Sequence, residues 1–229
     1  MNETVRKIFG SKNCLGRRYV ILLVGLLICS FGIACTTKAG LGTSPIASIP
    51  YTLSLIFTKC SFGLWAFAFG MAQILVQIIL LKGKVVITEM VIQAVLALVF
   101  GYATEFSMFL ISGITLDLYI FKLLFFILGC VIVALGVYLE LLGDVAMLSG
   151  DAFIKVIAQV AHRQYGNIKI INDISMTAIS AVLCLIFLNA LVGVREGTVI
   201  AAFIVGPIIR ICQKVFKPLG EKLLLDENK

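Results

Sequence analysis

The chain has 229 residues, of which 61% are hydrophobic and 14% charged, and its mean hydropathy is +1.10. A soluble globular domain carries about 25% charged residues, so this composition excludes one. The formal net charge of +7 comes from basic residues in short stretches beside apolar runs, without the continuous basic stripe of a nucleic-acid-binding protein. We therefore expect an integral membrane protein that contacts membrane lipid and has no nucleic-acid partner.

The first apolar run, Tyr19 to Thr37, follows a basic segment at residues 1–18. A basic start before an apolar run also describes a secretory signal peptide, but this run is long enough to cross a bilayer. In addition, Gly32 stands where a lipoprotein signal ending at Cys35 would have leucine. We expect this run to remain as the first membrane helix.

Six apolar segments are long enough to cross the roughly 30 Å hydrocarbon core as helices. They are Tyr19 to Thr37, Phe62 to Leu81, Val85 to Ser112, Leu118 to Leu142, Ile174 to Val192 and Gly197 to Phe216. Two shorter apolar segments, Thr43 to Thr58 and Ser149 to Arg163, lie between them. The sequence therefore predicts an all-α, polytopic membrane protein in which the short segments are re-entrant or interfacial helices.

The basic residues favour six crossings over eight. If neither short segment crosses, most basic connections lie on the same side as the basic N-terminus, which the positive-inside rule assigns to the cytoplasm. They contain Lys82, Lys84, Lys155, Arg163, Lys169, Lys214, Lys217 and Lys222. If Thr43 to Thr58 crossed as well, Lys82 and Lys84 would move outside. We expect both termini in the cytoplasm.

Spacings of about 104 residues indicate an internal repeat. Gly25 and Gly32 match Gly129 and Gly136 at an offset of 104, and Ser44, Met71 and Gly101 match Ser149, Met176 and Gly206 at 105. The expected organisation is a cytoplasmic N-terminus at 1–18, repeats at 19–112 and 113–217, and a cytoplasmic tail at 218–229. Three crossings per copy would give the copies opposite orientations, an arrangement common in secondary transporters.

Each short segment begins with a turn suited to a helix start. In the first, Gly42 and Thr43 precede Ser44 as the capping residue and Pro45 at the first helical position, and Pro50 is expected to interrupt or kink the helix. In the second, Asp144 precedes Ser149 and Asp151. Helix starts carry free N–H groups and partial positive charge, so both turns are candidates for binding a polar or anionic solute. The alternative is ordinary capping of interfacial helices.

Ionisable residues inside the apolar runs are further candidates, because they are costly in lipid unless they face protein or water. Glu105 is expected to make a buried contact, and its repeat equivalent is Arg210, since 210 − 105 = 105. Glu89 and Glu140 lie near segment ends, where they can reach headgroups. No metal or other cofactor is expected, because seven cysteines without CxxC spacing and the lone His162 supply no ligand pattern. Cys35 and Cys60 are either packing residues or a disulfide on the outer side.

The sequence resembles the YczE/YyaS/YitT family of bacterial integral membrane proteins. The resemblance rests on Gly40 to Pro45, Phe62 to Trp65, Ser149 to Phe153 and the stretch from Gly193 to Pro207. It implies the bacterial cytoplasmic membrane as location and adds Thr198 to the candidates. The candidate substrate-binding residues are Gly42, Thr43, Ser44, Pro45, Asp144, Ser149, Asp151, Glu105 and Thr198.

The leading functional hypothesis is a secondary transporter or permease for an unknown small polar solute. The alternative is a non-transporting membrane accessory or assembly protein, and homo-oligomerisation is left open. An enzyme is not expected: Gly42-Thr43-Ser44 is similar to a serine nucleophile turn, but Pro45 replaces the glycine of a rhomboid motif and His162 is expected on the opposite side. The sequence also has no phosphate-binding P-loop.

Overall fold

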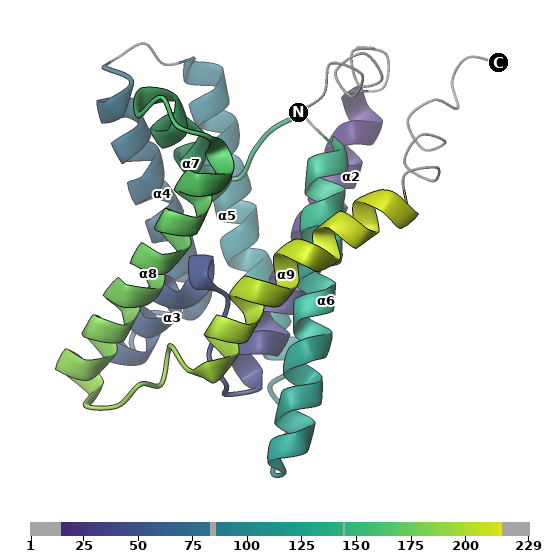
Figure 1. Cartoon of the computed structure of the whole chain (residues 1–229), viewed down its shortest axis with the longest axis vertical. Coiled ribbons are helices and arrows are strands. Elements are labelled where there is room, and N and C mark those ends of the chain that lie inside the picture. Colours follow the sequence, from purple (N-terminus) through teal and green to yellow (C-terminus); the bar gives the residue numbers. More distant parts are fainter. Residues whose placement is uncertain (1–14, 83–85, 144, 217–229) are drawn as a thin grey trace.

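The structure is a computed structural model that describes residues 15–82, 86–143 and 145–216 (Figure 1). Six of its helices are long and apolar enough to cross a membrane. These are α2 (Leu15–Lys38), α4 (Phe62–Leu80), α5 (Ile87–Leu110), α6 (Tyr119–Gly143), α8 (Tyr165–Leu188) and α9 (Glu196–Val215). Two shorter helices, α3 (Pro45–Ile56) and α7 (Ser149–Val160), lie between them. The predictions of an all-α fold and of six long apolar helices are confirmed.

One boundary prediction was wrong. The fifth long helix begins at Tyr165, nine residues before the predicted Ile174, because the polar residues in its first turns are accommodated by contacts with α7. Pro50 lies inside α3 and does not end it, which excludes the expected interruption and leaves the kink as a prediction. Predictions for residues 1–14, Lys84, Asp144 and residues 217–229 lie outside the described residues.

Helices α2 and α6 form the centre of the molecule. In the most apolar 18-residue stretch of α2, about 67% is buried, which is more than in any other long helix of the described chain. The two helices run antiparallel and approach closely at glycines: a methyl group on Gly25 would lie 2.8 Å from Glu140 N, and one on Gly32 would lie 2.5 Å from Val133 N. Small residues allow such approaches between membrane helices.

The contacts across this pair are related by the 104-residue offset. A methyl group on Gly129 would lie 2.9 Å from Thr36 N, which reproduces the Gly25–Glu140 contact, since 25 + 104 = 129 and 36 + 104 = 140. Gly136 likewise faces Cys29 N, as Gly32 faces Val133 N. If each residue in these contacts is replaced by its equivalent in the other helix, the same set of contacts results.

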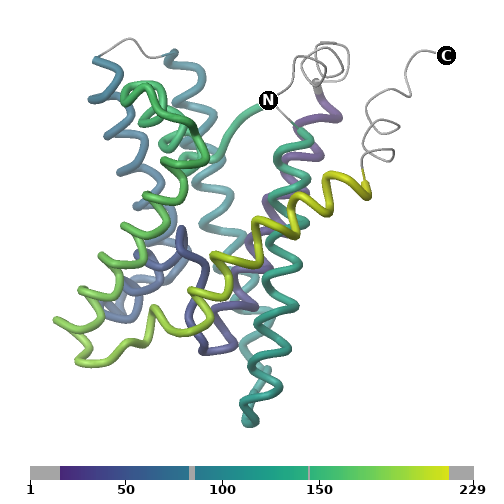
Figure 2. Tube along the Cα trace, in the orientation of Figure 1, coloured from purple at the N-terminus to yellow at the C-terminus, as the bar shows by residue number. Residues whose placement is uncertain are grey.

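The outer helices pack on this centre in matching pairs, with one exception. Helix α5 packs on α2 as α9 packs on α6, and α3 packs on α8 as α7 packs on α4. Helices α4 and α5 pack tightly, with a methyl group on Gly101 only 2.7 Å from Gly63 O. By contrast, α8 and α9 diverge from the segment that joins them (Figure 2), and a methyl group on Gly206 would meet nothing within 4 Å.

Candidate functional site

The two short helices begin against each other in the interior of the bundle. A methyl group on Gly150, the second residue of α7, would lie 2.7 Å from Cδ1 of Ile46, the second residue of α3. Each residue is the second of its short helix, so the contact joins the two helix starts. Helix α3 runs parallel to α8, because Ser48 contacts Met176 and Thr52 contacts Ser180.

Helix α7 runs in the other direction. It begins beside Gln73 and Gln77 of α4, and its later residues line the same cavity as Leu81 at the end of α4. Successive crossings alternate, so α4 and α8 run in opposite senses. The two short helices therefore extend from a shared meeting point toward opposite ends of the bundle.

The first predicted turn is held against the start of α9. Gly40 and Gly42 have φ of 71° and 102°, conformations that favour glycine. Leu41 O accepts a hydrogen bond of 2.8 Å from Gly197 N, and a methyl group on Gly42 would lie 2.5 Å from Thr198 Oγ1. The predicted candidates Gly42 and Thr198 are thus brought together, although they are 156 positions apart.

Short polar side chains join α3 to the rest of the bundle. Thr43 Oγ1 lies 3.0 Å from Thr37 Oγ1, and both side chains are buried. Thr52 Oγ1 lies 2.6 Å from Ser180 Oγ, whose hydroxyl donates to Ser48 O at 3.0 Å. These contacts fix the position of α3, and with it the position of Ser44 and Pro45 at its start.

Glutamines of α4 and α5 hold the start of α7. Gln77 Nε2 donates to Ser149 O at 3.2 Å and to Gln93 Oε1 at 3.1 Å, and Ser149 Oγ donates to Gln73 Oε1 at 3.3 Å. Gln77 is fully buried. Together with Gln93 it lines a cavity of about 500 Å³ that extends between α4, α5 and α7. The cavity is also lined by Leu81, Val86, Glu89, Met90, Ile92, Val145, Ala146, Met147, Ala152, Lys155, Val156 and Gln159.

Several buried polar atoms around the meeting point have no hydrogen-bond partner in the described part of the chain. They are Ser44 Oγ, Gln73 Nε2, Gln77 Oε1 and Thr198 Oγ1. In addition, no described side chain caps the start of α3 or of α7. Buried polar groups normally have partners, so these four atoms are available to hydrogen-bond a molecule or water bound at the meeting point.

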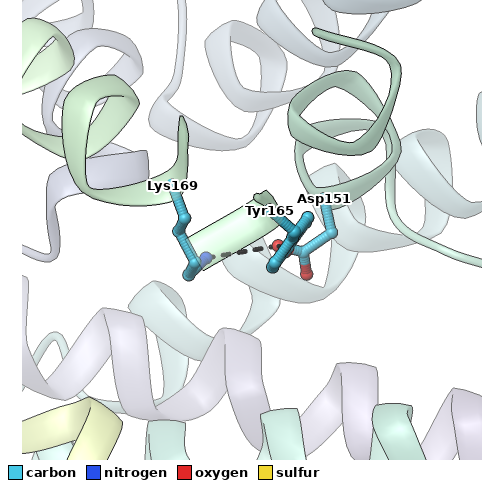
Figure 3. A network of polar contacts seen from close by, with 3 residues as sticks. All are labelled: Asp151, Tyr165 and Lys169. Atoms are coloured by element: carbon cyan, nitrogen blue, oxygen red, sulfur yellow. Dashed lines mark hydrogen bonds and ion pairs between the residues drawn. The ribbon is translucent and has the colours of Figure 1, made fainter. Parts of the chain in front are cut away.

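Asp151, in the first turn of α7, faces α8. Its Oδ1 accepts a hydrogen bond of 2.9 Å from the Tyr165 hydroxyl and lies 3.2 Å from Lys169 Nζ (Figure 3). The side chain of Asp151 is 28% exposed and that of Lys169 is 42% exposed, so the pair is only partly buried. Asp151 therefore links α7 to α8 and does not cap its own helix.

Glu105 lies apart from the meeting point. Its Oε2 accepts a hydrogen bond of 3.1 Å from Gly63 N at the start of α4, and the residue is exposed. Gly70, which contacts Ser149, is seven residues further along α4, or about 10 Å along the helix. The expected contact is present, but the expected burial of the residue was wrong, because Glu105 caps the first turn of α4 from an exposed position.

The structure thus brings Gly42, Thr43, Ser44, Pro45, Ser149 and Thr198 to the two helix starts, with Asp151 in the first turn of α7 and Glu105 elsewhere. Sequence reasoning missed Gln77, Tyr165 and Lys169. A signal for Gln77 existed, since two glutamines four residues apart share one face of a membrane helix. Lys169 carried no such signal, because it was placed in a connection. Cys35 and Cys60 are both free cysteines, so they form no disulfide.

Comparison with known proteins supports the family resemblance. A family model described as "Family of unknown function (DUF6198)" matches residues 16–214. The "Uncharacterized protein YyaS" of Bacillus subtilis (strain 168) is 26% identical over 216 residues, which cover 93% of this chain and 98% of that protein. No solved structure matches.

Proposed function

Because this chain belongs to the DUF6198 family of unknown function, its own residues must carry the argument, and we propose that it is a secondary transporter for a small polar solute. The observation that carries the proposal is the meeting of two short helices at Ile46 and Gly150, with unpartnered buried polar atoms around it. Substrate sites of secondary transporters are typically formed where discontinuous helices end inside the membrane.

The proposal includes an inverted repeat. Contacts between α2 and α6 exchange into one another at an offset of 104, and the two helices are antiparallel. A two-fold axis that exchanges antiparallel helices is perpendicular to both, so it lies in the plane of the membrane. The matching of α3 on α8 with α7 on α4 agrees with such an axis. The solute would then bind close to it, where the two helix starts meet.

A mismatch between the halves suggests how access alternates. Gly101 packs against Gly63, whereas its equivalent Gly206 faces open space, since 101 + 105 = 206. The α4–α5 side is therefore closed while the α8–α9 side is open. In the alternate state we expect the two sides to exchange roles, with α8 and α9 packed and α4 and α5 separated.

The proposed location is the bacterial cytoplasmic membrane with both termini in the cytoplasm, as the distribution of basic residues favours. In this orientation, the Asp151–Lys169 pair lies toward the cytoplasmic side, and the contact of Glu105 with Gly63 lies toward the outside. We assign no catalytic chemistry to the chain.

Transport can be tested without knowing the solute. Proteoliposomes are incubated with a mixture of small polar metabolites under imposed proton or sodium gradients, in both directions, and the retained solutes are identified by mass spectrometry. We expect time-dependent, saturable uptake of at least one solute by the native protein. A Gly150→Leu variant that folds but fills the meeting point should lose it. Equal retention in native, variant and empty liposomes would favour the accessory role.

A further inference from the structure

Helices α6, α7 and α8 bring three acidic side chains into the electrostatic field of one lysine. Asp151 and Lys169 form an ion pair, and Coulombic interactions connect this pair with Glu140 of α6 and with Asp173 of α8. Lys169 is the ammonium group that acts on all three carboxyl groups. Inside a membrane protein ionised side chains require a partner, and one ammonium group cannot pair closely with three carboxylates at once.

Glu140 is the carboxyl that lacks a partner. Within residues 15–82, 86–143 and 145–216 it makes no hydrogen bond or ion pair, and its Oε1 is completely buried. Its backbone lies at a close approach of α2 to α6, opposite Gly25, so the helix cannot easily turn this residue away. A carboxylate oxygen that is buried without donors is unfavourable, and taking up a proton removes that cost.

A metal ion does not fit this cluster. In the described chain, no group of three or more His, Cys, Asp or Glu side chains lies close enough together to hold a metal ion. The groups that act electrostatically on Glu140 are Asp151 of α7 and Lys169 of α8, and Cys29 of α2 lies in the field of all three. Helix α9 also packs on α6, but it contributes no such group among its described residues.

Resting on the transport proposed above, we infer that Glu140 binds the coupling proton and that Lys169 controls its release. While Lys169 pairs with Asp151, Glu140 holds the proton. When Lys169 moves toward Glu140, the carboxylate is stabilised and the proton passes to water. The reverse movement leaves Glu140 unpaired, and it takes a proton from water. One proton is bound and released in each cycle, without any other reactant.

The proton site can be tested independently of the solute by infrared spectroscopy. The full chain, reconstituted in liposomes, is titrated while the carbonyl stretch of protonated carboxyl groups is recorded. We expect a pH-dependent band that disappears in Glu140→Gln and persists in the matched variant Glu105→Gln. Within the transition, Lys169→Gln should show a stronger band than the native protein at the same pH, because the ammonium no longer stabilises the carboxylate. An unchanged band in Glu140→Gln would overturn the inference.

Transport measurements separate this inference from the proposed function. If a solute is accumulated in response to a proton gradient, Glu140→Gln should lose that accumulation but retain exchange of solute across the membrane. Accumulation equal to that of the native protein would contradict the role of Glu140 while leaving transport intact. Loss of the infrared band without uptake of any solute would support the proton site and contradict transport.

Discussion

Replacement of Gly32 by alanine should weaken the packing of α2 on α6. The added methyl group would lie 2.5 Å from Val133 N and 2.9 Å from Gly129 O, both of which are backbone atoms. Carbon atoms in good packing contact are about 3.5–4.0 Å apart, so the two helices must separate or shift. Gly16→Ala is the matched control, because it lies in the same helix and a methyl group there would meet nothing within 4 Å.

The size of the effect follows from two opposing contributions. Overpacking of this kind costs about 1–3 kcal/mol, while alanine gains about 0.5–1 kcal/mol over glycine in a helix. Gly16→Ala has only the gain in helix stability, so the free energies of unfolding of the two variants should differ by the cost of overpacking. For a chain of this size, a change of 1 kcal/mol in the free energy of unfolding shifts the melting temperature by about 2–4 °C. The apparent melting temperatures of Gly32→Ala and Gly16→Ala should therefore differ by about 2–12 °C.

The assay heats detergent-purified protein in steps and follows the monodisperse peak by size-exclusion chromatography. Gly136→Ala should behave like Gly32→Ala, because Gly136 faces Cys29 N as Gly32 faces Val133 N. Equal melting temperatures for Gly32→Ala and Gly16→Ala would refute the close α2–α6 contact. A large effect at Gly32 with none at Gly136 would refute the equivalence of the two halves.

Three further substitutions test the contacts around the short helices. Thr52→Val removes the hydroxyl that contacts Ser180, and it should lower the free energy of unfolding by about 0.5–1.5 kcal/mol in denaturant titrations. Tyr165→Phe removes a partly exposed hydrogen bond to Asp151, so thermal stability should fall by less than about 1 kcal/mol; a larger loss would show a buried contact. Gln77→Leu leaves Ser149 O and Gln93 Oε1 without their donor, and a loss of about 1–3 kcal/mol is expected in the same titration; an unchanged value would contradict the glutamine contacts.

Local signals predicted most of the helical framework. Apolar runs of about 20 residues identified six long helices, and Pro45 marked the start of α3 because its missing N–H costs nothing there. The start of α8 was misplaced because Lys169, Asn172 and Asp173 look like part of a connection in the sequence. Their tolerance inside a long helix depends on contacts with α7, which no local pattern contains.

The site was predictable only in part for the same reason. Glycine and serine turns pointed to both helix starts, but their meeting at Ile46 and Gly150 depends on how the two halves pack. Glu140 was expected near headgroups because it lies close to the end of its segment. In the structure it faces the interior instead, since α2 covers α6 at that level.

The most direct test of the central claim asks on which side each short helix ends. Single cysteines replace Thr58, beyond the end of α3, and Gln164, beyond the end of α7, in a background without the native cysteines. Both positions are exposed and uncharged, so the substitutions leave the basic residues in place. A membrane-impermeant thiol reagent should label Thr58→Cys only from outside and Gln164→Cys only from the cytoplasmic side. Labelling of both from the same side would contradict the opposite orientation of the two halves, and with it the proposed transport site.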